Sequence, residues 1–431
     1  MKTKKGFFLI MAIISALSLS AQEVVRMSLG ECINYAETHN NTLRNAELDR
    51  SSSEISYNEA KLRYAPTVSA TASQGFGYSN HNATASWTGN YGISAGMTLF
   101  DGFSTYNNVK LNKLSLKQSE LKVEQSRNSI NIQIMQAYLS ILMNTERLAY
   151  QQDVLNTSQE QVKEGELQFK VGKILESDYN LLKANHTSAA YDVENTKIAI
   201  DNELLTLKKL LGLPSYTKLE IVKPDTDTDN ASLTMPTLES AVERALAYLP
   251  ELKSSEAGVE MAKYDIKMAK SDYSPTLSLS AGVSTGYTNF DEAWGTQVSN
   301  NLGENVGLNL SIPIYNRNST RSKVKQSKIR LQQAEMENEQ LKLDITSEIE
   351  QKYLAAAQAY NTYKSSEALE KAYKDSYAVY NEKFKAGAIT TVDLIHQQSN
   401  YLNVLNQFLQ NKYSYLMNRK ILDVYMGVPL K

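Results

Sequence analysis

The fold is decided by a stretch from Tyr64 to Phe103, which reads YAPTVSATASQGFGYSNHNATASWTGNYGISAGMTLFDGF. Nearly every second residue is apolar from Val68 to Tyr78 and again from Tyr91 to Leu99, and the residues between them are small or polar. A period of two over about ten residues is typical of a strand in a membrane barrel, although strands of soluble sandwiches have a similar pattern. The predicted strands cover about residues 66–78 and 91–100, with Trp87 in the loop between them.

The same hairpin pattern occurs a second time later in the chain. Pro66 and Pro275 lead the two hairpins and are 275 − 66 = 209 positions apart. Beyond the hairpin loops the offset becomes 215, as between Gly172 and Gly387 (387 − 172 = 215). A constant offset that changes once, inside a loop, indicates a tandem duplication. The second pair of strands is predicted at about residues 275–287 and 305–315, with Trp294 in the loop.

Helical segments flank each hairpin. Residues 104–164 and 316–386 contain neither glycine nor proline, and each predicts a helix of about 90–100 Å at a rise of ~1.5 Å per residue. A glycine-centred turn and a helix of about half that length follow each of them. The shorter helices are predicted at residues 31–65, 175–211, 238–273 (interrupted at Pro250 and Gly258) and 391–425.

The start of the chain predicts a secretory signal peptide over residues 1–21, because three lysines precede the apolar run Phe7–Leu19 and small residues follow it. Removal of these lysines changes the formal charge from −2 to −2 − 3 = −5, which argues against nucleic acid as a partner. No other apolar run reaches the ~18 residues of a membrane helix, so we expect any membrane crossing to be a barrel.

Neither a cofactor site nor an enzyme site is indicated by the sequence. The single cysteine, Cys32, is interpreted as a small buried residue of the first helix. The four histidines lack the spacing of metal ligands, and no nucleophile or acid–base constellation appears. We therefore expect no metal and no catalytic residues. The histidines are His39, His81, His186 and His396.

The predicted fold class is mostly α with a membrane β-barrel part, built from two tandem repeats of helix, β-hairpin, long helix and helix. The repeats cover residues 22–214 and 237–431, and a polar linker at residues 215–236 joins them. Four strands are too few to close a membrane barrel, which needs at least about eight, and an open edge is not tolerated in lipid. The strands of several chains must therefore combine, unless the protein is a plain soluble helical bundle.

With this doubled layout the chain resembles the TolC-like outer membrane efflux protein family. The residues that carry the resemblance are the duplicated turns, Phe169–Gly172 with Asp178 and Phe384–Gly387 with Asp393. The resemblance implies a homotrimer whose protomers each give four strands to a twelve-stranded outer-membrane barrel. It also implies a periplasmic helical tube with the linker at its equator, and docking to a periplasmic adaptor held by an inner-membrane transporter.

The resemblance also implies two sets of functional residues. The adaptor-docking turns would be formed by Val171, Gly172, Lys173, Ala386, Gly387 and Ala388. The periplasmic constriction would be formed by Asp178, Asp393, Phe384, Ile389 and His396. Lys173 replaces a leucine of the family pattern, and Phe384, Ile389 and His396 replace a tyrosine, an arginine and an aspartate. Simpler roles exist for several of them, since acids favour helix starts and glycines allow a positive φ.

The function expected from this resemblance is that of an outer-membrane export duct for small toxic compounds in a tripartite efflux system. A type I protein secretion channel or a metal efflux channel remains an alternative within the same class. A periplasmic helical scaffold without a pore is the alternative from a different class. Outer-membrane trimers that dissociate on heating would separate the duct from the scaffold.

Overall fold

The structure is a computed structural model that describes residues 24–79, 84–223, 235–288 and 293–428. The expected signal peptide at residues 1–21 lies outside this range, as does part of the expected linker. The chain divides into two compact units. The sheet unit comprises Ala46–Val123 and Pro250–Lys342, and the bundle unit comprises Met1–Asn45, Glu124–Leu249 and Leu343–Lys431. Each unit therefore contains segments of both sequence repeats.

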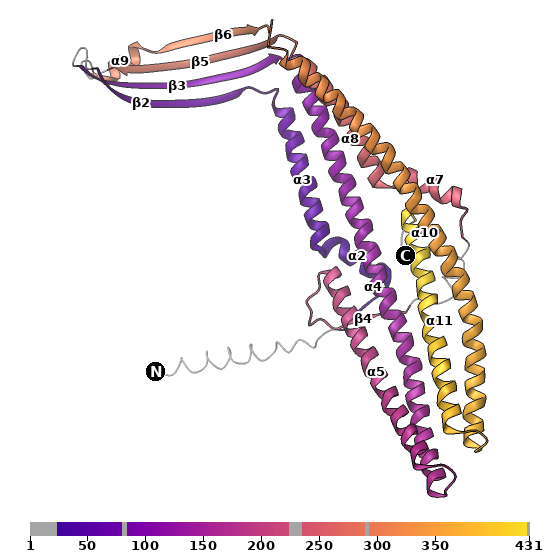
Figure 1. The fold of residues 1–431 in the computed structure, drawn as a ribbon. Coiled ribbons are helices and arrows are strands. Elements are labelled where there is room, and N and C mark those ends of the chain that lie inside the picture. The colour runs from indigo at the N-terminus through magenta and orange to yellow at the C-terminus, as the bar shows by residue number, and fades with distance from the viewer. Residues whose placement is uncertain (1–23, 80–83, 224–234, 289–292, 429–431) are drawn as a thin grey trace, which may run out of the picture. The chain divides into compact units, whose positions relative to one another are not determined.

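The sheet unit contains one antiparallel four-stranded sheet, in the order β2-β3-β5-β6 (Figure 1). The two expected hairpins therefore lie side by side, and the second strand of one pairs with the first strand of the other. The strands are β2 (Thr67–Ser79), β3 (Thr84–Phe100), β5 (Thr276–Thr288) and β6 (Gly303–Ser311).

Two of these strands differ from the sequence-based prediction. β3 begins at Thr84 rather than near Tyr91, because residues expected in the loop continue the ladder with β2. Trp87 is one of them, and its ring lies 4.9 Å from that of Phe76 in the opposite strand. β6 ends at Ser311 rather than near residue 315. In the second hairpin, Trp294 begins a short helix, α9 (Trp294–Asn300), which the sequence reading missed.

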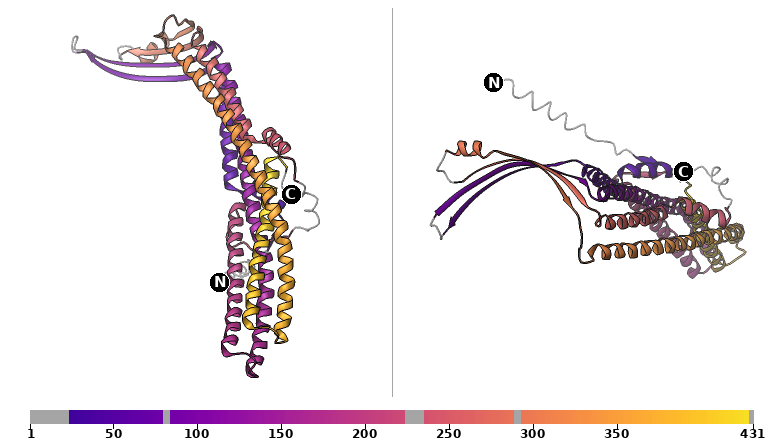
Figure 2. Two further views of the ribbon diagram at one scale, coloured as in Figure 1. Left: turned by 45° about the vertical axis from the view of Figure 1, so that its right-hand side comes forward. Right: turned by 90° about the horizontal axis from the view of Figure 1, so that it is seen from above.

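Two helices of 67 residues each follow the hairpins: α4 (Ser104–Lys170) and α10 (Ser319–Lys385). Gly165 does not interrupt α4, in agreement with the predicted long helix. None of the described helices is both long and apolar enough to cross a membrane. In the sheet unit, the first parts of α4 and α10 run beside α3 (Asn41–Leu62) and α8 (Pro250–Ser271) (Figure 2).

The bundle unit packs the far parts of α4 and α10 with α5 (Glu176–Leu211) and α11 (Thr391–Tyr425). It also contains α2 (Leu29–His39) and α7 (Leu238–Tyr248). A parallel pair of short strands, β1 (Val25–Met27) and β4 (Leu219–Ile221), ties the start of the described chain to the linker between the repeats. The sequence reading treated this part of the linker as irregular and missed β4.

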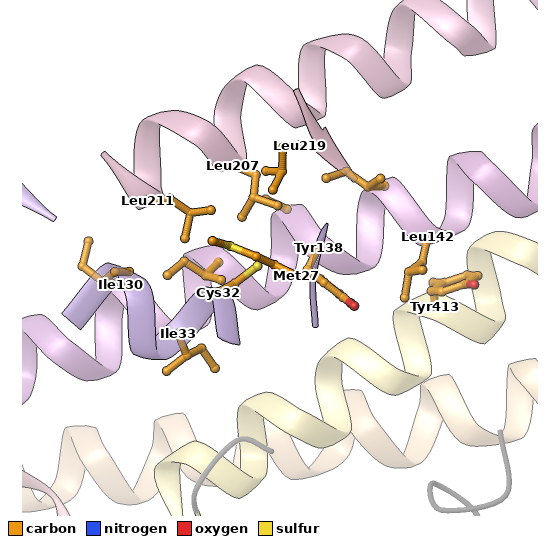
Figure 3. Close-up of a cluster of buried hydrophobic side chains, with 14 residues drawn as sticks. Met27, Cys32, Ile33, Ile130, Tyr138, Leu142, Leu207, Leu211, Leu219 and Tyr413 are labelled. Carbon is orange, nitrogen blue, oxygen red and sulfur yellow. The ribbon is translucent and has the colours of Figure 1, made fainter. Parts of the chain in front are cut away.

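The core of the bundle unit lies where α2, α4 and α5 meet the two short strands (Figure 3). Cys32 is completely buried there, as predicted, and burial raises the pKa of its thiol to about 12. The thiol is therefore protonated at neutral pH and behaves as a small apolar group. The other labelled members of the cluster are Met27, Ile33, Ile130, Tyr138, Leu142, Leu207, Leu211, Leu219 and Tyr413.

The predicted first helix of each repeat is two helices. In the first repeat the break falls at Asn40, between α2 and α3, although the segment contains neither glycine nor proline. In the second repeat Pro250 breaks the helix, as predicted, but Gly258 lies inside α8 and does not. Asn40 and Leu249 are equivalent in the duplication (249 − 40 = 209). The two repeats therefore bend at the same place for different chemical reasons.

Candidate functional site

The expected docking turns are two helix C-termini of identical design. At the end of α4, Gly172 has φ +75° and donates its N–H to the carbonyl of Phe169 at 3.0 Å, while Lys173 donates to Gln168 at 2.8 Å. At the end of α10, Gly387 has φ +72° and donates to Phe384 at 2.8 Å. These bonds form Schellman motifs, in which a left-handed residue satisfies the last carbonyls of the helix.

The side chains of both turns are exposed. Val171 is 69% exposed, and Lys173, Ala386 and Ala388 are exposed as well. No atom lies within 4 Å of the position that a Cβ would take on Gly172 or Gly387. The glycines are therefore required by the backbone conformation and not by crowding, and both turns present open surface.

A side chain that the sequence reading missed connects the two turns. Gln168, in the last turn of α4, is 6% exposed and donates its Nε2 to the carbonyl oxygen of Phe384 at 3.4 Å. Two turns earlier in the same helix, Gln161 donates to Asn381 of α10 at 3.0 Å and to the Tyr377 hydroxyl at 3.3 Å. A polar seam therefore joins the ends of α4 and α10. The sequence contains no spacing signal for it, because glutamine is common on any solvated helix face.

Asp178 and Asp393 occupy the third position of the helices that follow the turns. Asp393 and Thr390 form a complete capping box: the Asp393 carboxylate accepts from Thr390 N at 3.3 Å, and Asp393 N donates to Thr390 Oγ1 at 3.2 Å. Leu175 has no acceptor in its side chain, so only the bond from Leu175 N to the Asp178 carboxylate, at 3.4 Å, is present in α5. Both acids therefore stabilise helix starts, whatever further role they have.

The remaining three residues of the expected constriction divide into two groups. Phe384 is 1% exposed and lies in an apolar cluster with Leu182 and Leu394, against which the half-buried Ile389 packs. Phe384 and Ile389 therefore take part in the packing between helices of the same chain. His396 is exposed on α11, where its Nδ1 lies 3.2 Å from Nδ2 of Asn400.

An ion pair joins α4 to α11 in the middle of the bundle unit. Lys412 Nζ lies 2.8 Å from both carboxylate oxygens of Glu146, and the Tyr413 hydroxyl donates to Glu146 Oε2 at 2.8 Å. Burial opposes ionisation of Glu146, but these hydrogen bonds prevail and lower the pKa of its carboxyl group. Among the described residues, no group of three His, Cys, Asp or Glu side chains could hold a metal ion.

The sheet gathers most of its apolar residues on one face, and one row of them crosses all four strands. Ala95 of β3 lies opposite Val68 of β2 and Ala281 of β5, which in turn lies opposite Val306 of β6. The neighbouring row, Ser69, Ser94, Gly282 and Asn305, is small or polar. Because side chains of one row share a face of the sheet, the register produces one apolar face and one polar face. Val306 is 80% exposed, so no element of the described chain covers this face of β6.

Comparison with known proteins places these features in a family. A family model described as outer membrane efflux protein matches residues 32–213 and 241–428. The outer membrane protein TolC of Salmonella enteritidis is 22% identical over 431 residues, which cover 97% of this chain and 86% of that protein. The outer membrane efflux protein BepC of Brucella suis is 24% identical over 335 residues, or 76% of this chain and 69% of that protein. A solved structure of CusC superposes with a TM-score of 0.80 at 16% identity and covers 96% of each chain.

Proposed function

The chain belongs to the outer membrane efflux protein family, and on this premise we propose that it is the outer-membrane duct of a tripartite efflux system. It passes small toxic compounds from a periplasmic adaptor and an inner-membrane transporter to the exterior. The observation that carries the proposal is the four-stranded sheet, which has one apolar face and two edge strands, β2 and β6. The family model matches the chain in both repeats that form this sheet. Such a sheet becomes stable in lipid only when other copies cover its edges.

Three copies close the barrel in this proposal. Three sheets of four strands give twelve, within the range of known outer-membrane barrels, and the β6 edge of one copy pairs with the β2 edge of the next. The repeats at residues 22–214 and 237–431 then contribute one hairpin each per protomer, and residues 215–236 form an equatorial linker. The helical parts form a tube in the periplasm.

The two tips dock the adaptor in this proposal. Val171, Gly172, Lys173, Ala386, Gly387 and Ala388 form the contact surface. Its support is their exposure, together with Gln168, which holds the two turns next to each other. Cysteines placed at Lys173 and Ala388 should form cross-links to the adaptor in cells. Failure of both positions to capture the adaptor, with the trimers intact, would place docking elsewhere.

Asp178, Asp393 and His396 line the periplasmic constriction in this proposal, and Phe384 and Ile389 act behind them by fixing the helix ends. An arginine–aspartate lock is absent at these positions, because Ile389 is apolar. Closure then depends on the packing of the helix ends and not on ion pairs. Phe384→Ala removes the ring that packs behind the tip, so it should loosen the helix ends and increase conductance.

Expression of the chain in a strain that lacks its own outer-membrane duct tests the function. We expect heat-dissociable trimers in the outer-membrane fraction and restored resistance to a panel of toxic compounds when the matching adaptor and transporter are present. Restored export of a protein and not of small compounds would favour the secretion alternative. Monomers confined to the periplasmic fraction would contradict the proposal and support a scaffold.

A further inference from the structure

The two strand-to-helix junctions of the sheet unit have the same backbone conformation but differ in charge. In each, two successive residues with positive φ connect the strand to the long helix: Gly102 (+65°) and Phe103 (+67°) before α4, and Arg317 (+54°) and Asn318 (+62°) before α10. The pairs are equivalent in the duplication, since 317 − 102 = 215. Arginine rarely adopts a positive φ, and the first repeat has glycine at the equivalent position. The backbone conformation therefore does not favour Arg317, and its side chain must explain why an arginine is present there.

The first junction carries a carboxylate. Asp101 caps the start of α4, where its Oδ2 accepts from the backbone N–H of Thr105 at 2.8 Å and from the Thr105 hydroxyl at 2.6 Å. The equivalent residue of the second repeat is Asn316, whose Nδ2 donates to the Thr320 hydroxyl, so the direction of the hydrogen bond is reversed. The side chains still pair at equivalent positions, but the negative charge is removed.

The second junction carries a dense cluster of cations instead. Residues 316–334 contain six basic residues and no acidic one, whereas the equivalent residues 101–119 contain Asp101 and three lysines. Arg317, Arg321, Lys323, Lys325 and Lys328 are exposed. Asp272, which directly follows α8, is already paired with Lys323 of this cluster at 2.7 Å. We call residues 316–328 the basic rim.

An amphipathic cavity of about 270 Å³ lies beside the basic rim, just after the end of β6. Its apolar wall contains Pro313, Ile314 and the rings of Tyr273 and Tyr315, and its polar wall contains Arg321, Asn316, Asn318 and the paired Asp272. Ile314 is 96% exposed and Tyr315 is 78% exposed, so apolar and basic groups are both presented outward within a few residues.

This combination of apolar, aromatic and basic side chains suits the boundary between the acyl chains and the headgroups of a phospholipid layer. If the apolar face of the sheet contacts lipid, as the proposed function requires, the basic rim follows directly where β6 ends and the headgroups begin. Aromatic side chains favour that boundary, and clustered arginines and lysines next to a membrane segment attract anionic headgroups. A guanidinium can bind two phosphate oxygens at once.

We propose that the basic rim, with Arg317 and Arg321 at its centre, binds the phosphate of an anionic phospholipid of the periplasmic leaflet, and that the junction of the first repeat does not. The lipid's phosphate lies against the two guanidinium groups, and its first acyl methylenes lie against Ile314 and Tyr315. Each protomer therefore has one strand-to-helix junction that binds the lipid, the basic rim, and one that does not, the first junction. This inference rests on the proposed outer-membrane location.

Purified trimers titrated with phosphatidylglycerol or phosphatidylethanolamine, with bound lipid counted by native mass spectrometry, test the inference. We expect a preference for phosphatidylglycerol. A basic residue near an anionic surface contributes about fivefold in affinity. The Arg317→Gln, Arg321→Gln variant should therefore bind phosphatidylglycerol about 25-fold more weakly, whereas the matched control at the first junction, Lys110→Gln with Lys113→Gln, should be unchanged.

A gain-of-binding variant keeps the test independent of folding defects. Asp101→Asn with Tyr106→Arg removes the carboxylate of the first junction and adds one of the two guanidinium groups of the second, because Tyr106 is equivalent to Arg321 (321 − 106 = 215). It should increase the binding of phosphatidylglycerol at the first junction by at least about fivefold. If free inorganic phosphate binds the rim as well as phosphatidylglycerol does, the site is a plain anion site and the lipid assignment is wrong. Equal binding of phosphatidylglycerol by the arginine variant and the wild type would also contradict the proposal.

Trimer assembly and channel conductance are measured in the same preparations. Conducting trimers without a lipid preference would contradict only the basic rim. Loss of trimers and conductance in the wild type would contradict the proposed function and the lipid site together.

Discussion

At Asn40 a helix ends without a glycine or a proline. The side chain is 5% exposed, and its Oδ1 accepts from the N–H groups of Thr42 (2.8 Å) and Leu43 (3.1 Å), so it caps α3. Its Nδ2 donates to the carbonyl of Leu210 at 2.7 Å, near the end of α5. One buried amide therefore begins one helix and satisfies the end of another.

Asn40→Ala should destabilise the bundle unit by about 2 kcal/mol, because it removes the cap of α3 and the hydrogen bond to the carbonyl of Leu210. Thermal unfolding followed by circular dichroism measures the change. Asn40→Asp should recover part of it, since a carboxylate still caps α3 but does not donate to Leu210. Asn41→Ala, at the exposed neighbouring position, is the control and should have little effect.

Four glycines with φ near +75° end helices, and they should respond differently to alanine. At Gly172 and Gly387 the added Cβ meets nothing, so only the left-handed backbone is penalised, by about 1 kcal/mol each. At Gly427 it would lie 2.6 Å from the Tyr248 ring, and at Gly212 it would lie 2.7 Å from the carbonyl oxygen of His39. Because a backbone carbonyl moves less easily than a ring, Gly212→Ala should lower the melting temperature most. Equal losses at all four positions would contradict this order.

Among the elements, α4 and α11 are joined by the ion pair of Glu146 and Lys412. Because the pKa of Glu146 is lower in the folded state, its ionised carboxylate stabilises the fold. This stabilisation is fully present above the ordinary carboxyl pKa range, about pH 4–5, and is lost as the pH falls through the folded-state pKa. Glu146→Gln should therefore be less stable at neutral pH and should lose part of the acid dependence of the melting temperature. Glu194→Gln, in the exposed pair with Lys197, should match the wild type at every pH.

The two faces of β6 should respond differently to a charge. Leu308 lies opposite Leu279 in an apolar row, and Asn309 lies opposite Ser278 in a polar one. Leu308→Arg should cost about 2–4 kcal/mol near the bilayer midplane and reduce the yield of outer-membrane trimers, while Asn309→Arg should assemble normally. Equal assembly of the two variants, measured in heat-modifiability gels, would show that the apolar face does not meet lipid.

For the whole molecule, both compact units are assembled from both repeats, and α4 and α10 belong to both units. The duplication is therefore not a pair of independent domains. Each repeat contributes one hairpin to the sheet unit, and one short helix and a pair of long helical segments to the bundle unit.

In the proposed trimer, three copies each of Asp178 and Asp393 surround one axis at the tip. Rings of carboxylates attract cations and repel anions, so the reconstituted channel should be cation-selective. Asp178→Asn with Asp393→Asn should weaken that selectivity, measured as reversal potential across a salt gradient, more than it changes conductance. Asparagine retains an oxygen acceptor for the helix start, so the fold should persist. Unchanged selectivity would leave both acids as helix-start residues alone.

The sequence alone determined the types of the long helices and of the four strands of the sheet, because their signals are local and occur in both repeats. Alternation of period two around Tyr91 and Leu279, long glycine-free runs, and the glycines at 172 and 387 each reflect backbone preferences of neighbouring residues. The repeat offset then ruled out accidental patterns. Burial of Cys32 followed in the same way from residue type and position on a helix.

The tertiary structure alone decided how separated segments meet. The side chain at the break also bonds to Leu210, 170 residues from Asn40, and the extension of β3 to Thr84 continues its pairing with β2. Phe384 lies in the core of the tip because Leu182 and Leu394 surround it. The pairing of β3 with β5 joins the two hairpins into one sheet. Such contacts depend on residues far apart in the chain, and no local preference encodes them.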